Sequence, residues 1–184
     1  ARACRGRISE DRALRHMILS AAFLVAACQN ETAKAPDPVT MTAAAVGHYC
    51  QMQIDQHPGP KAQIHLAGLP DPIFFAQVRD ALAYVKGQER DGDILAIYVS
   101  DMGSAPSWEE PGRDNWINAE TGDFVVGADV VGGMGAPEIV PFSDAKAAKP
   151  FAARKGGEVM TLQDMPAEAV LAPVDVTLEE EAPS

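Results

Sequence analysis

The sequence predicts an α+β protein built from two similar ββαβ units, which follow an export signal and a flexible tether. Two observations favour this class. Short stretches that alternate apolar and polar residues, as half-buried strands do, occur in two runs, and each run also contains one stretch with helical spacing. Glycine- and proline-rich turns at comparable places indicate a weak internal repeat. In that repeat, the turn that carries Met134 is equivalent to the turn that carries His57.

The first unit is expected over residues 46–105. Its two opening strands should form a hairpin, because the strong turn signal His57-Pro58-Gly59-Pro60 separates them. The helix is indicated by an Asp-Pro start, apolar residues three and four positions apart, and a final glycine. The elements are strands over 49–54 and 62–66, a helix from Asp71 to Gly87 with apolar residues Phe74, Phe75, Val78, Leu82 and Val85, and a strand over 94–100.

The second unit, preceded by a long loop, is expected over residues 106–172. A flexible Gly-Gly-Met-Gly turn separates its first two strands. Ser143 is a helix-capping residue type, Pro150 weakens the helix that follows, and the pair Gly156-Gly157 stops it. The elements are a loop over 106–115, strands over 124–126 and 138–142, a helix from Ser143 to Arg154, and a strand over 158–162.

Residues 1–27 have the features of a cleaved export signal. Arginines precede an apolar run over 17–27, which is too short for an ordinary transmembrane helix. Small residues directly before Cys28 resemble a bacterial lipobox, so we expect cleavage before Cys28 and lipid on its side chain; a plain secretory signal is the alternative. Residues 28–45 then form the lipidated tether, and residues 173–184 an acidic tail.

This signal predicts a periplasmic, lipid-anchored protein. Gln29 after Cys28 is not the usual inner-membrane retention residue, which favours the outer membrane over the inner one. The formal net charge is −11, and removal of residues 1–27, which carry a net +3, leaves −14. Such an acidic chain is not expected to bind nucleic acid or anionic lipid headgroups.

The segment His48-Tyr49-Cys50-Gln51-Met52 carries the strongest chemical signal. Cys4 leaves with the signal and Cys28 takes lipid, so Cys50 is the free thiol that remains in an oxidising compartment. In an extended strand, residues i and i+2 share a face, which would place the side chains of His48, Cys50 and Met52 together. Soft sulfur ligands favour Cu(I). A buried, inert cysteine is the alternative.

A third sulfur would close such a site. Met134 is the first candidate, because flanking glycines let the backbone approach closely, and Met102 in an Asp-Met-Gly turn is the second. His48 and His57 are candidates for a further ligand or for a hydrogen bond to one. The sequence contains no CxxC, HExxH or GxSxG motif and no phosphate-binding loop, so we expect a binding protein rather than an enzyme.

Several motifs, taken together and in order, resemble the NosL family of copper-binding lipoproteins. The lipobox and tether come first, and the resemblance covers roughly residues 46–172, although family members often have glycine where this chain has Gln51. The other motifs are Cys50-Gln51-Met52, His57-Pro58-Gly59-Pro60-Lys61, Tyr98-Val99-Ser100-Asp101-Met102-Gly103, Asn115-Trp116-Ile117 and Gly133-Met134-Gly135.

The resemblance implies a periplasmic Cu(I) chaperone with an organomercurial lyase-like fold and the ligands Cys50, Met52 and Met134. It implies delivery of copper for the tetranuclear copper-sulfide centre of nitrous oxide reductase, in denitrification. The implied partner is the membrane complex NosDFY, through its NosD subunit. Two other functions stay open: a thiol enzyme that acts on a soft-metal compound through Cys50 and His57, and a structural interaction lipoprotein with Cys50 in its core.

Overall fold

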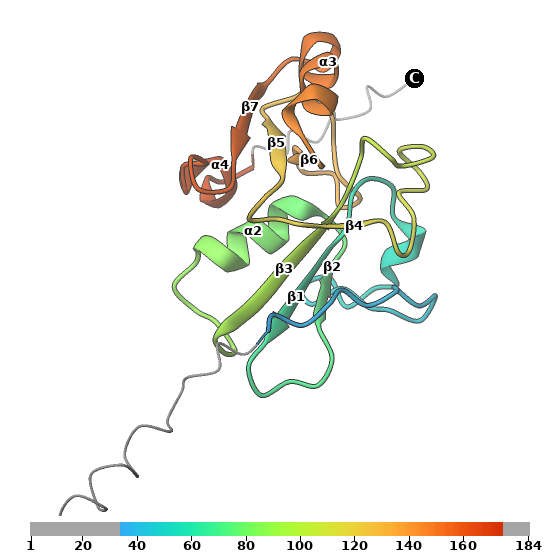
Figure 1. Cartoon of the computed structure of the whole chain (residues 1–184), viewed down its shortest axis with the longest axis vertical. Coiled ribbons are helices and arrows are strands. Elements are labelled where there is room, and N and C mark those ends of the chain that lie inside the picture. Colours follow the sequence, from blue (N-terminus) through green and yellow to red (C-terminus); the bar gives the residue numbers. More distant parts are fainter. Residues whose placement is uncertain (1–33, 175–184) are drawn as a thin grey trace, which may run out of the picture. The chain divides into compact units, whose positions relative to one another are not determined.

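The computed structural model describes residues 34–174, and Figure 1 shows its path. The predicted signal, the lipidated Cys28 and the tail beyond residue 174 lie outside the described residues. The elements are η1 (Ile54–Gln56), β1 (Ala62–Leu66), β2 (Ile73–Phe75), α2 (Val78–Lys86), β3 (Ile94–Ser100), β4 (Trp116–Asn118), β5 (Asp123–Val126), β6 (Val140–Phe142), α3 (Ala145–Lys155), β7 (Glu158–Thr161) and α4 (Glu168–Leu171).

Two small antiparallel sheets organise these elements. The first has the strand order β2-β1-β3-β4 and the second the order β6-β5-β7. The chain runs strand, strand, helix, strand from β1 to β3 and again from β5 to β7. The predicted α+β class is therefore confirmed. None of the helices within residues 34–174 has the length and apolar character needed to cross a bilayer.

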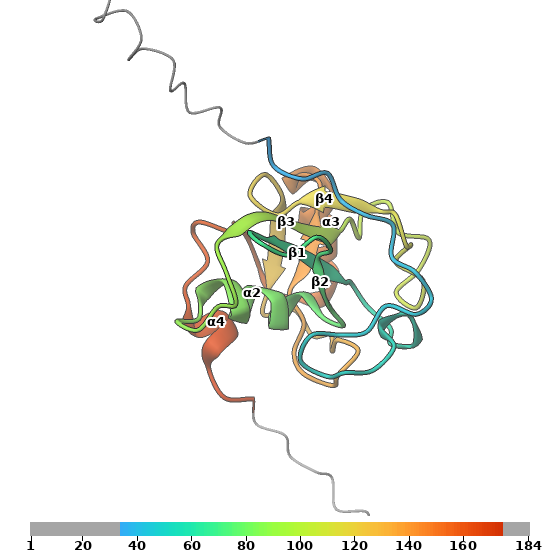
Figure 2. The ribbon, with the colours of Figure 1, turned by 90° about the horizontal axis from the view of Figure 1, so that it is seen from below.

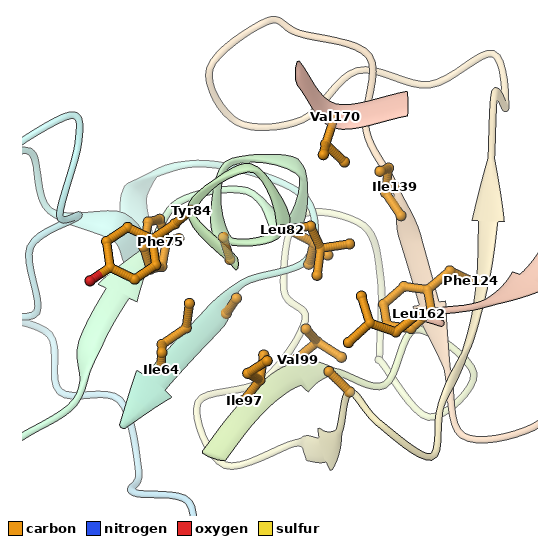
Figure 3. Close-up of a cluster of buried hydrophobic side chains, with 14 of the residues drawn as sticks. Ile64, Phe75, Leu82, Tyr84, Ile97, Val99, Phe124, Ile139, Leu162 and Val170 are labelled. Carbon is orange, nitrogen blue, oxygen red and sulfur yellow. The ribbon is translucent and has the colours of Figure 1, made fainter. Parts of the chain in front are cut away.

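One hydrophobic core joins the two sheets. Helix α2 buries Val78, Ala81 and Leu82, residues three and four positions apart, as expected for one face of a helix. Figure 3 shows Leu82 pointing toward Phe124 of β5. A fully buried aliphatic side chain of this size contributes about 1.5–3 kcal/mol. The same cluster contains Ile64, Phe75, Val99, Ile139, Leu162 and Val170.

The opening hairpin was predicted with the wrong partner. Residues 49–54 form a turn and a 3-10 helix rather than a strand, and β1 instead pairs with β2, with Ala62 opposite Phe75. The residues Phe74 and Phe75 that were assigned to the helix belong to β2. Strand β2 leads almost directly into α2. By chance, its apolar residues lie three and four positions from apolar residues of the helix, so the helical spacing seemed to begin earlier than the helix does. The predicted helix end at Gly87 is confirmed.

In the second half, the expected strands and helix are confirmed with small shifts in their ends. Helix α3 begins after Asp144, whose Oδ1 accepts a hydrogen bond of 2.9 Å from the Ala147 amide, so Asp144 rather than Ser143 is the cap. Pro150 lies inside this helix. Gly156 follows it with φ of 75°, a value at which an L side chain would be strained.

Part of the predicted tether is fixed to the first sheet. The Gln63 side chain both accepts from the Val39 amide and donates to the Val39 carbonyl, each at 2.9 Å. The Tyr98 hydroxyl donates to the Pro36 carbonyl at 2.6 Å. Residues 36–41 thus lie against β1 and β3, and the expectation of a free tether up to residue 45 is wrong for them. They run to the segment that carries Cys50.

Candidate metal site

The segment that carries Cys50 is a tight loop, which we call the Cys50 loop (residues 47–52). The Gly47 amide donates to the Met52 carbonyl, and the Gln51 amide donates to the Gly47 carbonyl, both at 2.9 Å. The predicted extended strand at these residues is therefore wrong, because this local pairing closes the backbone into a turn. Residues i and i+2 share a face in an extended strand. In this turn, that geometry does not apply to His48, Cys50 and Met52.

The loop holds the thiol half-buried and leaves the thioether exposed. The Cys50 side chain packs against Met41, Ile54 and Ala76. Its Sγ lies so close above Gly47 that a Cβ there would be 2.5 Å away, so a larger residue at position 47 would displace the thiol. The Met52 side chain is 43% exposed. Cys50 is therefore a fixed thiol at the edge of a small apolar cluster, with a thioether in the same loop.

Gln51, between the two sulfur residues, has an unusual backbone conformation. Its φ is 56°, and among residues 34–174 it alone combines a positive φ with a side chain. An L residue in this region costs about 1–2 kcal/mol. The Gln51 side chain offsets part of that cost, since its Nε2 donates to the carbonyls of His48 at 2.7 Å and Gly47 at 3.3 Å.

Substitutions at Gln51 should separate these two effects. Gln51→Ala removes both side-chain hydrogen bonds and keeps the backbone strain, so we expect it to destabilise the fold by about 1 kcal/mol. Gln51→Gly removes the same hydrogen bonds but also the strain, and should be more stable than Gln51→Ala by about 1 kcal/mol. Urea unfolding of the two variants measures the difference. An alanine variant at least as stable as the glycine variant would contradict the backbone argument.

Met134 lies at the tip of a second turn, the Met134 loop (residues 131–137), between β5 and β6. The Gly132 amide donates to the Ala136 carbonyl at 2.8 Å, and the Gly135 amide to the Gly132 carbonyl at 2.9 Å. The Met134 side chain is 39% exposed. The loop is thus closed by its own backbone, and its thioether is turned outward.

The Cys50 loop and the Met134 loop both approach Ala76, the residue that follows β2, whose place at one edge of the first sheet is visible in Figure 2. A Cβ on Gly47 would lie 3.8 Å from the Ala76 amide nitrogen, and a Cβ on Gly133 would lie 3.4 Å from the Ala76 carbonyl oxygen. His57, which follows the Cys50 loop, has its Nδ1 3.1 Å from the Gly133 carbonyl oxygen. The structure therefore places the two predicted sulfur-bearing loops on either side of one residue.

The contact of His57 with the Met134 loop does not arise as the predicted repeat implied. Because the first hairpin is β1 and β2, the turn equivalent to the Met134 loop is the one over residues 67–72. The turn that carries His57 precedes β1 instead. It reaches the Met134 loop across the molecule, through the contact of His57 with Gly133.

The remaining candidates face other groups. The His48 ring lies 5.3–5.6 Å, centroid to centroid, from the rings of Tyr49, Phe75 and Tyr84. Its Nε2 is 3.4 Å from Asp91 Oδ2. Met102 packs against a different apolar cluster from the one that contacts Cys50. His48 is thus placed among aromatic rings and beside Asp91, and Met102 within a second apolar cluster.

Three buried polar residues near the two loops were not predicted: Lys61, Gln77 and Glu138. Burial lowers the pKa of Lys61 to about 8, and its Nζ donates to the carbonyls of Gly59 at 2.6 Å and Pro58 at 3.1 Å. Burial raises the pKa of Glu138 to about 8. Gln77 and Glu138 have hydrogen-bond partners remote in sequence, which leave no local pattern, so the sequence gives no signal for these two residues.

The chemistry of the site follows from its donors. The thiol of Cys50 and the thioethers of Met52 and Met134 are soft donors, a type that suits Cu(I) better than a hard divalent ion. Within residues 34–174, His, Cys, Asp and Glu side chains do not gather in threes with a geometry that could hold a metal.

Comparisons with known proteins agree with this chemistry. A family model described as NosL matches residues 38–170. The chain is 48% identical to the "Copper-binding lipoprotein NosL" of Achromobacter cycloclastes over 92% of its length and 89% of the relative. It is 29% identical to the protein of that name from Stutzerimonas stutzeri, over 78% and 75%. The crystal structure of "the copper chaperone NosL from Shewanella denitrificans" superposes with a TM-score of 0.66 at 29% identity, over 70% of this chain and 95% of that one.

Proposed function

Since the chain belongs to the NosL family, we propose that it is a periplasmic, lipid-anchored metallochaperone that binds Cu(I) and hands it on without catalytic turnover. One observation carries the proposal. Two loops flank the same residue, Ala76: the one that carries Cys50 and Met52 approaches it through Gly47, and the one that carries Met134 approaches it through Gly133. The names of the relatives as copper-binding proteins support copper as the metal.

The oxidation state follows from the ligand type. Cu(I) accepts few ligands and prefers thiolate and thioether sulfur, whereas nitrogen and oxygen donors suit Cu(II). Binding requires the Cys50 thiolate, so copper uptake should release a proton. The charges of the ion and the thiolate then cancel, which permits a half-buried site.

Transfer requires an accessible ion. The two thioethers are each about two-fifths exposed, and exposed apolar side chains lie on the same loops or directly before them: Val46, Tyr49 and Val131. A soft, apolar surface at the ligands is suited to contact with a receiving protein. We propose NosD of the NosDFY complex as that receiver. The copper is then used to assemble the tetranuclear copper-sulfide centre of nitrous oxide reductase.

The anchor fits the same role. Lipid on Cys28, as the lipobox predicts, would hold the protein at a periplasmic membrane surface, with the outer membrane favoured over the inner. The curated relatives are also named lipoproteins. Residues 36–41 lie against the sheet and lead toward the Cys50 loop, so this part of the predicted tether belongs to the folded body.

The alternatives have less support. A thiol enzyme that uses Cys50 with His57 needs the imidazole to activate the thiol. The Nδ1 of His57 instead contacts the Gly133 carbonyl. A purely structural lipoprotein would bury Cys50 fully and would give no reason for an exposed Met52 in the same loop.

Titration of the purified, reduced protein with Cu(I), followed by X-ray absorption, tests the proposal. We expect one copper ion per chain with only sulfur in its first shell, and loss of one sulfur in each of Met52→Ala and Met134→Ala. A copper site made of nitrogen and oxygen in the wild-type protein would overturn it. Cell extracts add the transfer test: copper-loaded protein should lose its metal to membranes that contain NosDFY but not to membranes without it.

A further inference from the structure

We infer that Gln77 and Glu138 form a reciprocal clamp that holds the Met134 loop on the first turn of α2 and thereby positions the Met134 thioether for copper. This inference rests on the proposed function, and it adds two positioning residues to the predicted ligands. Neither residue is a ligand: each acts through the backbone of the other's segment.

The first half of the clamp is Gln77, the residue that precedes α2. Its side chain is 2% exposed. Its Oε1 accepts a hydrogen bond of 3.0 Å from the Met134 amide, and its Nε2 donates to Asp80 Oδ1 at 3.1 Å. Both ends of the amide are thus engaged, which fixes the side-chain rotamer. The backbone of Met134 is thereby tied to a residue that directly follows Ala76.

The second half is Glu138, which acts in the opposite direction. It follows the Met134 loop, and its Oε1 accepts from the Arg79 amide at 3.0 Å and from the Ile139 amide at 2.9 Å. The Arg79 amide is one of the donors at the start of a helix that have no partner within the helix. Glu138 thus caps α2 from a segment 59 residues away, while the residue before α2 holds the Met134 loop.

The glycines of the Met134 loop are required by this arrangement. A Cβ on Gly132 would overlap Glu138 Oε2 and lie 2.6 Å from Gln77 Oε1. A Cβ on Gly133 would lie 2.5 Å from the Cβ of His57 and 2.9 Å from the Pro58 carbonyl oxygen. The loop backbone is therefore packed on two sides. Its exposed methionine is carried by a fixed backbone, not by a loose one.

A fixed backbone has a direct use in metal binding. Ligands that come from two separate loops lose conformational freedom when they converge on one ion, and that loss lowers affinity unless the loops are held in place beforehand. The Cys50 loop packs on Ala76 and the Met134 loop is bonded to Gln77, so adjacent backbone residues fix both. The clamp therefore holds the backbones of the two sulfur-bearing loops in fixed positions relative to each other.

The test compares Gln77→Leu with wild type in two measurements. The first needs no copper: amide hydrogen exchange at Met134 should be strongly protected in the wild-type protein and at least about tenfold faster in Gln77→Leu. The second is Cu(I) affinity, which should fall by about 10- to 100-fold in Gln77→Leu, with one sulfur lost from the X-ray absorption spectrum. In a Met134→Ala background the same change should alter affinity by less than about twofold.

Gln88 is an exposed glutamine beyond the C-terminal end of α2. Gln88→Leu is therefore the matched control and should behave as wild type. An unprotected Met134 amide in the wild-type protein overturns the clamp whether or not Gln77→Leu folds. If wild type binds copper through three sulfurs and Gln77→Leu keeps all three, the clamp is wrong while the proposed function stands. If wild-type copper has no sulfur ligand, the proposed function fails and the inference fails with it.

Discussion

Replacing Cys50 by serine is expected to lower the affinity for Cu(I) by more than about a hundredfold, because loss of a partner outside the metal's own ligand shell already costs about 10- to 100-fold. A serine hydroxyl is hard and stays protonated, so the variant loses both the soft donor and its negative charge. Two neutral thioethers then hold the cation at the protein edge. Competition with a chromophoric Cu(I) chelator under reducing conditions measures the change.

The fold should tolerate this substitution. Cys50 is half-buried at the edge of the cluster formed by Met41, Ile54 and Ala76, and serine is smaller than cysteine. We expect a cost of about 1 kcal/mol in unfolding free energy. Met52→Ala removes a more exposed and uncharged donor, so its effect on affinity should be smaller than that of Cys50→Ser. A Cys50→Ser protein that binds Cu(I) as tightly as wild type would remove the thiol from the site.

The second half of the fold was readable because its signals are local. The expected start of α3 at Ser143 is one residue early, since Asp144 caps the helix through the Ala147 amide, and Gly156 ends it with a positive φ as expected of a glycine stop. Each of these features depends on residues within one helical turn, which is the range over which sequence patterns act. The strand after α3 follows directly on Gly157, and the strands on both sides of the helix were found within two residues of their ends.

The first hairpin was misread because the alternation of residues 49–54 is incidental. The segment closes on itself through the Gly47–Met52 hydrogen bond and through the left-handed conformation of Gln51. Glycine at position 51 would have indicated a turn, since only glycine adopts that conformation without strain. Glutamine at this position gives no such indication in the sequence. In the structure, its side-chain hydrogen bonds stabilise the turn.

The sulfur ligands could be proposed from sequence, but the residues that hold them could not. Cys50 and Met52 are adjacent in the chain, and Met134 stands out between glycines. Gln77 and Glu138 look like ordinary polar residues until the fold brings α2 to the Met134 loop. A buried polar group is recognised by its hydrogen-bond partners, and here those partners lie 57 and 59 residues away.

The stability of the protein is expected to fall as pH rises from about 4.5 to about 8. Burial raises the pKa of Glu138 from 4.5 to about 8, despite hydrogen bonds from two amides and the charge of Lys61. Over this window the folded protein keeps a proton that the unfolded chain has released, so each rise in pH favours the unfolded state. The slope for one such group is at most about 1.4 kcal/mol per pH unit.

Lys61 should reverse the trend at higher pH. Burial lowers its pKa from 10.5 to about 8, so between these values the unfolded chain holds a proton that the folded protein has lost. Stability should then rise with pH as the unfolded state loses that advantage. The two buried groups together predict a minimum of stability near pH 8, which urea unfolding over a pH series can locate.

Glu138→Gln isolates the first of these effects. The amide oxygen can still accept from the Arg79 and Ile139 amides, while an amide nitrogen replaces Oε2, the buried side-chain oxygen without a hydrogen-bond partner among the described residues. The cap on α2 is kept and the titrating group is lost, so the variant should match wild type near pH 4.5 and exceed it increasingly up to pH 8. Parallel curves for the two proteins would mean that Glu138 is charged when folded. Its proximity to Lys61 would then outweigh its burial.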